Sequence, residues 1–173
     1  LAIEYKGEVI VNLWGGHRDS NKSLEWEENT LINVFSVTKG ITAICVSKLI
    51  DEGKLDHNQK VSYYWPEYGC NGKEDTIVSD FLCHRAGMFG FQNGMPKGSW
   101  QNWQNFVSHL EAQTPYNAPG FSQGYHALTY GWLVGELFRR VDGRTVGEYF
   151  KEEIAIRHDI DFHIGLQKED FSR

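Results

Sequence analysis

The chain has 173 residues, a length typical of about one domain with a hydrophobic core of its own. Hydrophobic residues make up 40% and aromatic residues 14%, so the composition excludes intrinsic disorder, collagen-like repeats and a coiled coil. The formal net charge of −6 repels nucleic acid phosphates, and only Arg139, Arg140 and Arg144 form a basic cluster. We therefore expect a soluble globular protein that does not bind nucleic acid.

Membrane and redox signals are weak. No apolar stretch approaches the roughly 20 residues that a transmembrane helix needs. A leader upstream of Leu1 would be invisible in this sequence. The three cysteines, Cys45, Cys70 and Cys83, lack metal-ligand spacing and favour reduced thiols. We expect a cytoplasmic location.

Two short runs at the start of the chain are rich in β-branched and aromatic residues. Ala2–Tyr5 and Glu8–Trp14 are separated by Lys6-Gly7, which predicts an antiparallel hairpin at the edge of a sheet. From Ser36 onward, apolar residues recur every three or four positions, which predicts a helix that ends at Gly53. The expected buried face of this helix holds Val37, Ile41, Ile44, Cys45 and Leu49.

The middle of the chain is expected to be mostly loop. Residues 54 to 78 have little periodicity and contain Pro66, so we expect only short helical turns there. A short helix then follows from Ser79, as its N-cap, to about His84. Another helix is predicted over Trp100 to Ala112, and it ends before prolines that cannot continue it.

The last third carries clearer signals. Leu128 to Val141 is strongly amphipathic and predicts a helix that Gly143 closes. Thr145 and Glu148 have the spacing of a capping box at the start of a last helix. Asp161 to Leu166 alternates between polar and apolar residues, as a strand does. No linker divides the chain into two independent domains.

The sharpest local motif is Ser36-Val37-Thr38-Lys39 at the start of the predicted long helix. Residues three apart lie on one face of a helix, so the Lys39 amine can reach the Ser36 hydroxyl. The positive end of the helix dipole favours a neutral amine and stabilises negative charge on the Ser36 oxygen. A neutral amine beside a hydroxyl is a general base with its nucleophile. The alternative is structural, with Ser36 as a helix N-cap and Lys39 as a solvated residue.

A second candidate follows the turn at Pro119-Gly120. Tyr125 lies just before the predicted amphipathic helix, where its phenol oxygen can face a cleft. A nearby lysine ammonium would favour phenolate, so Tyr125 is a second candidate base.

Six segments of the chain stand in a recognisable order. They are Ser36-Val37-Thr38-Lys39, Gly53 to Asp56, Tyr64-Trp65-Pro66-Glu67, His84-Arg85-Ala86-Gly87, Pro119-Gly120 with Tyr125, and Tyr130 to Glu136. The ordered set, which extends from about Leu1 to Leu166, resembles the serine β-lactamase-related family. The class C-like and esterase branch of that family is the most similar.

The resemblance implies an α/β (α+β) fold of the serine β-lactamase and DD-peptidase type, with an antiparallel sheet and a helical subdomain. It makes Ser36 the acyl-accepting nucleophile and Lys39 the amine that activates it, while Tyr125 moves a proton to the leaving group. The backbone N–H of Ser36 would be one oxyanion donor. Residues 1–173 would then be the N-terminal portion of a single domain.

Two departures from the family pattern matter. The second motif of the β-lactamase branch is Tyr-x-Asn, whereas this chain has Tyr125-His126-Ala127. The missing side-chain amide removes a hydrogen bond to an amide substrate, which shifts the expectation from β-lactams and peptides to carboxylic esters. Nothing after Leu166 matches the family's third motif, so we expect Leu1 and Arg173 to mark cuts in a longer protein.

Other residues have weaker claims on the site. His126 adjoins Tyr125 and is a candidate for contact with substrate, and a helix-surface position is the alternative. Trp100 and Trp103 are candidates for the wall of an apolar acyl pocket. The seven histidines show no metal-binding spacing, so we expect neither a metal nor another cofactor. Packing in the core is the expected role of Cys45, Trp14, Trp65 and Trp132.

Two functions from different classes follow from this sequence. The first is a metal-independent serine hydrolase that cleaves small-molecule carboxylic esters through an acyl-enzyme. The second is a non-catalytic relative that uses the fold for binding or assembly, which Ala127 and the missing third motif support. A β-lactam or peptide amide hydrolase is the further alternative.

Overall fold

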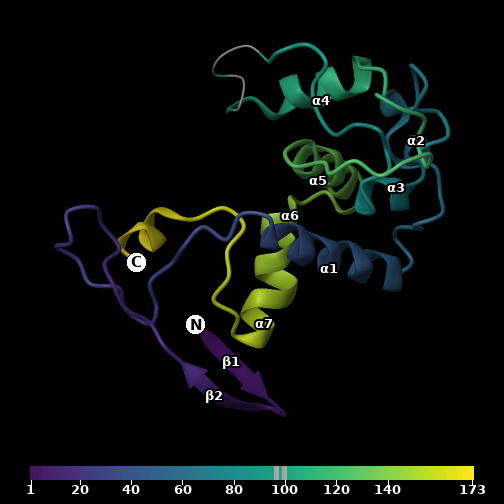
Figure 1. Ribbon diagram of the computed structural model, residues 1–173. Helices are drawn as coiled ribbons and strands as arrows, with labels where there is room; N and C mark the ends of the chain where they lie inside the picture. The colour runs from purple at the N-terminus through teal and green to yellow at the C-terminus, as the bar shows by residue number, and fades with distance from the viewer. Residues whose placement is uncertain (96–97, 99–100) are drawn as a thin grey trace. The chain divides into compact units, whose positions relative to one another are not determined.

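The computed structural model describes residues 1–95, 98 and 101–173 (Figure 1). The chain divides into two compact units, Phe35–Ile164 and a smaller one made of Leu1–Val34 with Gly165–Arg173. The candidate residues Ser36, Lys39 and Tyr125 all belong to the larger unit. The expectation that residues 1–173 are one portion of a single domain stays a prediction.

The smaller unit contains the predicted hairpin. Strands β1 (Ala2–Tyr5) and β2 (Glu8–Asn12) pair antiparallel, with Tyr5 opposite Glu8. Lys6 and Gly7 have φ of 52° and 83°, the left-handed pair that a two-residue turn between twisted strands requires. The antiparallel hairpin is therefore confirmed, but β2 ends at Asn12 rather than at Trp14, and in the described residues the two strands form a sheet of their own instead of the edge of a larger one. Trp14, which was expected to pack in a core, is 50% exposed.

The predicted strand at Asp161 to Leu166 is wrong, because the structure has irregular backbone there. Phe162 and Ile164 pack against the core of the larger unit, which explains the alternation without any sheet. The backbone of Ile164 lies so close to Gly147 that a Cβ at residue 147 would stand 2.2 Å from the Ile164 carbonyl oxygen. The alternation of polar and apolar residues at Asp161 to Leu166 therefore comes from a loop that packs against a helix.

Helix α1 (Val37–Asp51) confirms the longest predicted element. The N–H of Gly53, at φ 71°, donates to the Ile50 carbonyl and ends the helix as expected. The buried face differs from the prediction, because Val37 and Ile44 are 60% and 54% exposed. Cys45 and Leu49 are buried as predicted, and Thr42 and Val46 complete the buried face of α1, which contacts α5 and α6.

The short helices α2 (Val61–Tyr64) and η1 (Pro66–Tyr68) lie within the predicted loop. Helix α3 (Val78–Leu82) begins one residue before the expected N-cap Ser79, because the Asp80 carboxylate accepts the N–H of Ile77. It ends at Leu82 rather than at His84, which adopts a left-handed φ of 60°.

Helix α4 (Trp103–Ala112) starts later than predicted. The side chain of Asn102 accepts the N–H of Asn105 at 3.1 Å and caps the helix there. Trp100, where the helix was expected to begin, lies outside the described residues.

Helix α5 (Thr129–Asp142) and helix α6 (Val146–Phe150) follow the sequence pattern closely. Gly143, at φ 92°, closes α5. Thr145 and Glu148 form the predicted capping box, with the Thr145 N–H donating to the Glu148 carboxylate at 2.8 Å. Beyond α6 the helix widens into a π-helical turn, Lys151–Ala155, before α7 (Ile156–His158).

The core of the larger unit is rich in aromatic side chains. Trp65 is fully buried, and Trp132 stacks on Phe106 at 4.1 Å between ring centroids, so both predictions of a packing role are confirmed. Cys45 is also buried, and burial raises the pKa of its thiol to about 11. Within the described part of the chain, no helix is long and apolar enough to cross a bilayer.

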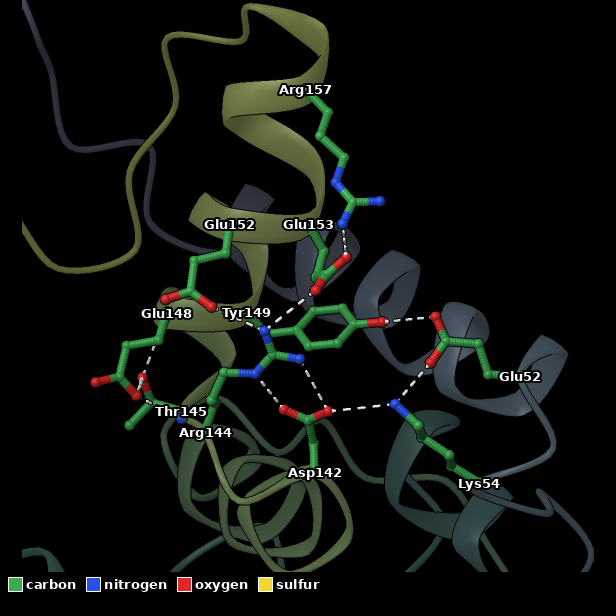
Figure 2. A network of polar contacts seen from close by, with 10 residues as sticks. All are labelled: Glu52, Lys54, Asp142, Arg144, Thr145, Glu148, Tyr149, Glu152, Glu153 and Arg157. Atoms are coloured by element: carbon green, nitrogen blue, oxygen red, sulfur yellow. Dashed lines mark hydrogen bonds and ion pairs between the residues drawn. The ribbon is translucent and has the colours of Figure 1, made fainter.

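Figure 2 shows a network of charged side chains that joins the C-terminal ends of α1 and α5 to α6 and the π-helical turn. The Arg144 guanidinium pairs with Asp142 at 2.6 Å and with Glu152 at 2.8 Å. Lys54 links Asp142, at 3.6 Å, to Glu52, at 2.9 Å. The network fixes the ends of the helices whose opposite ends carry the candidate site.

Candidate functional site

Ser36 stands at the N-cap of α1. Its hydroxyl makes no capping hydrogen bond to the described first turn, so capping of the helix does not engage the Ser36 oxygen. Phe35 precedes it at a left-handed φ of 46°, a conformation that costs a non-glycine residue about 1–2 kcal/mol. The strained residue turns the chain sharply into the helix and presents Ser36 at its start.

Lys39 lies one turn further along α1 on the same side. Its Nζ is 3.1 Å from Ser36 Oγ and donates to the carbonyl oxygen of Ala127 at 2.9 Å. The Ala127 carbonyl lies just before α5, so it holds the amine between two helices. The predicted reach of Lys39 to Ser36 is present in the structure.

Tyr125 approaches Ser36 from the other side. Its hydroxyl is 2.8 Å from Ser36 Oγ, and the Lys39 ammonium lies 5.0 Å from the centre of its ring. Hydrogen bonds with Ser36 and Lys39, together with the charge of Lys39, lower the pKa of the Tyr125 phenol below its ordinary value. Three residues that were singled out from the sequence therefore meet at one oxygen atom.

His126 does not lie on a helix surface, so that alternative is wrong. The ring is fully buried. Its Nδ1 lies 2.6 Å from the Gly124 carbonyl and its Nε2 accepts the N–H of Met88 at 3.2 Å. Burial lowers the pKa of His126 to about 4, so the ring is neutral with its proton on Nδ1. Both nitrogens bind protein partners, and the ring supports the Tyr125 loop from inside instead of offering a contact to substrate.

An apolar cavity of about 540 Å³ opens beside Lys39. It has the size of a small-molecule site. Its walls come from the start of α1, the start of α5 and the residues around the start of α4. They include Phe35, Thr38, Lys39, Thr42, Gln101, Trp103, Ala127, Leu128, Tyr130, Gly131 and Trp132.

Trp103 is held rigidly in the wall of this cavity. Its indole N–H donates to the buried Glu136 carboxylate at 2.8 Å. A Cβ on Gly135 would lie 2.8 Å from the Trp103 ring, so the glycine makes room for the tryptophan against α5. The structure thus places Trp103 in a pocket wall, whereas Trp100, the other candidate for that wall, lies outside the described residues.

Glu136 is a residue that sequence reasoning missed. Burial would raise the pKa of its carboxyl, but hydrogen bonds from Arg139, Trp103 and Arg140 outweigh burial and lower it. The sequence feature that could have identified Glu136 is a single acidic residue within the apolar face of a predicted helix, next to Leu133 and Leu137. In the described residues, no cluster of three or more histidine, cysteine or acidic side chains offers a metal site.

Comparisons with known proteins find similar sequences and similar solved structures. The sequence model of the family described as Beta-lactamase matches residues 1–173. The esterase/beta-lactamase LipL of Mycobacterium tuberculosis is 36% identical over 98% of this chain and 39% of its own length.

Two solved structures are similar over nearly the whole chain. A penicillin-binding protein homolog from Caulobacter crescentus has a TM-score of 0.93 at 38% identity, over 99% of this chain and 46% of its own. A family VIII carboxylesterase has a TM-score of 0.89 at 40% identity, over 96% of this chain and 46% of its own. The fold class expected from the sequence is confirmed, and the chain spans less than half the length of these relatives.

Proposed function

The chain belongs to the beta-lactamase family, and from that premise we propose that it carries the nucleophile of a serine hydrolase that cleaves carboxylic esters. The observation that carries the proposal is the convergence of Lys39 Nζ and the Tyr125 hydroxyl on Ser36 Oγ, at 3.1 and 2.8 Å. Both groups are within the distance at which a general base takes a proton.

The reaction follows from these contacts. Ser36 Oγ attacks the ester carbonyl carbon while its proton passes to the Tyr125 phenolate beside the Lys39 ammonium, or to Lys39 in its neutral amine form. The backbone N–H of Ser36, at the positive end of α1, stabilises the oxyanion that forms. The tetrahedral intermediate expels the alcohol, which takes the serine proton through Tyr125, either from Tyr125 itself or relayed from Lys39, and leaves an acyl-enzyme. Water deprotonated by the same pair then attacks the acyl carbon and releases the acid, and Ser36 regains its proton.

The identity of residue 127 favours esters over amides. Ala127 contributes only its carbonyl to the site, and that oxygen is engaged by Lys39 at 2.9 Å. No side-chain amide at this position can hydrogen bond the carbonyl of a substrate amide. An ester has a better leaving group and needs less of this assistance. The names of the two relatives, an esterase/beta-lactamase and a carboxylesterase, are consistent with this choice.

The cavity beside Lys39 indicates what the ester carries. Its walls include Trp103, Leu128 and Trp132, and the cavity begins at the residue that contacts the nucleophile. An apolar group of the substrate that enters it removes apolar surface from water, at about 25 cal/mol per Å². We expect kcat/KM to be higher for esters with a larger apolar acyl group than for acetate esters.

The test compares two serines in the full-length protein, one at the N-cap of α1 and one within that helix. Ser36→Ala is expected to abolish labelling by a fluorophosphonate probe and to lower the turnover of a short-chain p-nitrophenyl ester by at least about a thousandfold. Ser47→Ala, at an exposed position of α1, is the matched control and should behave like the parent. Labelling and turnover that are unchanged in Ser36→Ala would contradict the proposal and favour a non-catalytic role.

A further inference from the structure

We propose that His84 is a positioning residue that holds Tyr125 against Ser36. This inference rests on the proposed function and goes beyond it, because it assigns the geometry of the base to a residue outside the three that meet at Ser36. The argument starts from the turn that ends α3, where His84 sits at a left-handed φ of 60°.

His84 accepts two hydrogen bonds, from the residues on either side of Tyr125. The carbonyl oxygen of His84 accepts the N–H of Gly124 at 3.0 Å. The side-chain Nδ1 of His84 accepts the N–H of His126 at 3.2 Å. One residue thus fixes the backbone immediately before and immediately after Tyr125, which leaves the tyrosine little freedom to tilt away from Ser36.

The His84 ring also packs against the tyrosine ring. Its centre is 4.8 Å from that of Tyr125 and 5.2 Å from that of Tyr130, a buried residue at the start of α5. Tyr125 is 54% exposed, so it has few other contacts that could fix its ring. The imidazole therefore supplies both a backbone anchor and a surface on which the phenol rests.

The electrostatic surroundings keep His84 in the form that this role requires. An imidazole accepts a hydrogen bond at Nδ1 only when that nitrogen carries no proton. Partial burial, and then the charge of Lys39, lower the pKa of His84. The ring is neutral at pH 7 and can accept the His126 N–H.

The backbone around His84 is held independently of its side chain. Arg85 accepts the N–H of Gly120 at 2.9 Å through its carbonyl, and Gly87 accepts that of Tyr116 at 2.8 Å. A change of the His84 side chain should therefore leave the turn in place and remove only the Nδ1 bond and the ring contact.

The experiment uses two substitutions that both tolerate a left-handed backbone, His84→Asn and His84→Gly. Asparagine places an amide oxygen near the position of Nδ1, whereas glycine has no acceptor. In the full-length protein we expect His84→Gly to lower kcat for the p-nitrophenyl ester by about tenfold or more with KM within about twofold. His84→Asn should restore kcat to within about threefold of the parent. His109→Ala, on α4, is the control.

The outcomes separate this proposal from the proposed function. A Ser36-dependent parent whose His84→Gly variant keeps its kcat would overturn the positioning role alone. Equal losses of kcat in His84→Asn and His84→Gly would overturn the Nδ1 hydrogen bond as the anchor, since both variants lack the ring and differ in the acceptor. A parent whose turnover does not depend on Ser36 would overturn the proposed function and this proposal with it. If His84→Gly does not fold, His84→Gln replaces it. The glutamine side chain is one carbon longer than that of asparagine, so its amide oxygen does not take the position of Nδ1. A parental kcat in His84→Gln would count against the proposal.

Discussion

Two side chains contact the hydroxyl oxygen of Ser36. Ser36 Oγ has the Lys39 amine at 3.1 Å and the Tyr125 hydroxyl at 2.8 Å, and Lys39 is tied in addition to Ala127. Lys39 therefore has a second partner that orients it, while Tyr125 has its hydroxyl on Ser36. The lowered pKa of Tyr125 means that its phenol loses its proton at a lower pH than free tyrosine does.

Removal of the Tyr125 hydroxyl should separate these two roles. We expect Tyr125→Phe to lower kcat by about a hundredfold or more, the range typical of a lost general base. The pKa of Tyr125 is lowered from its ordinary value of 10.0, so phenolate forms at a lower pH than in free tyrosine. In the parent, kcat/KM should therefore rise with pH with a midpoint below pH 10, and this rise should be missing in Tyr125→Phe.

The exposed Tyr63 provides a control for the loss of a phenol. Tyr63→Phe should keep both the rate and the pH profile of the parent, because Tyr63 is 70% exposed and lies on α2. A pH profile of kcat/KM for a p-nitrophenyl ester, measured with all three proteins, decides the matter. An unchanged profile in Tyr125→Phe would assign the proton transfer to Lys39.

The residues of the candidate site could be predicted from the sequence where their contact depends on spacing along one helix. Ser36 and Lys39 are three residues apart on a helix, so their contact follows from helical geometry. The contact of Tyr125 with Ser36 joins positions 89 residues apart and came only from the resemblance to a family. The burial of His126 could not be predicted, because its partners are the backbone of Met88 and Gly124.

At the scale of elements, the charged network at the ends of α1, α5 and α6 is a stabilising device (Figure 2). The Asp142 side chain is only 4% exposed and receives two hydrogen bonds from Arg144, at 2.6 and 3.1 Å. Arg144 also lies over the Tyr149 ring at 4.7 Å. The carboxylate thus organises an arginine that connects α5 to α6.

Asp142→Asn should lower the free energy of unfolding by about 1–2 kcal/mol at pH 7, between the values for exposed and buried ion pairs. Arg144 lowers the pKa of Asp142, so the stabilisation is complete above the ordinary pKa near 4 and is lost as pH falls through the lower folded value. The parent should therefore lose more stability between about pH 5 and pH 2 than Asp142→Asn does. Urea unfolding at several pH values measures this difference.

An exposed ion pair offers the comparison. Asp75 pairs with Lys60 at 2.7 Å, and its side chain is 88% exposed. Asp75→Asn should change the free energy of unfolding by less than about 1 kcal/mol. An Asp142→Asn variant that is no less stable than Asp75→Asn at pH 7 would show that the network contributes nothing beyond an exposed pair.

Helices could be predicted better than the strand for a physical reason. The period and the end signals of α1 and α5 are local, and Gly53 and Gly143 end both where expected. The pattern at Asp161 to Leu166 records only which side chains are buried, and Phe162 and Ile164 are buried against helices rather than in a sheet. Val37 and Ile44 were wrongly predicted to lie on the buried face of α1, because the position of that face depends on where α5 and α6 pack.

At the scale of the whole molecule, the net charge of these residues bears on the proposed preference for neutral esters. These 173 residues carry a formal net charge of −6, which disfavours the approach of anions at low ionic strength. β-Lactams carry a carboxylate, whereas p-nitrophenyl esters are neutral. Long-range repulsion and the missing amide at Ala127 therefore act in the same direction.

We accordingly predict that kcat/KM of the full-length protein for p-nitrophenyl butyrate exceeds that for nitrocefin by at least about tenfold at low salt. Added salt should narrow this ratio, because it screens the repulsion of the anionic lactam and leaves the neutral ester unaffected. Ala127→Asn should narrow it as well, because the new amide can hydrogen bond a lactam substrate while the Ala127 carbonyl contact with Lys39 involves only backbone. Parallel assays of both substrates at two ionic strengths test both causes.

Faster hydrolysis of nitrocefin than of the ester would reverse the assignment. A ratio of the two kcat/KM values that salt leaves unchanged would exclude charge as a cause and leave residue 127 as the explanation.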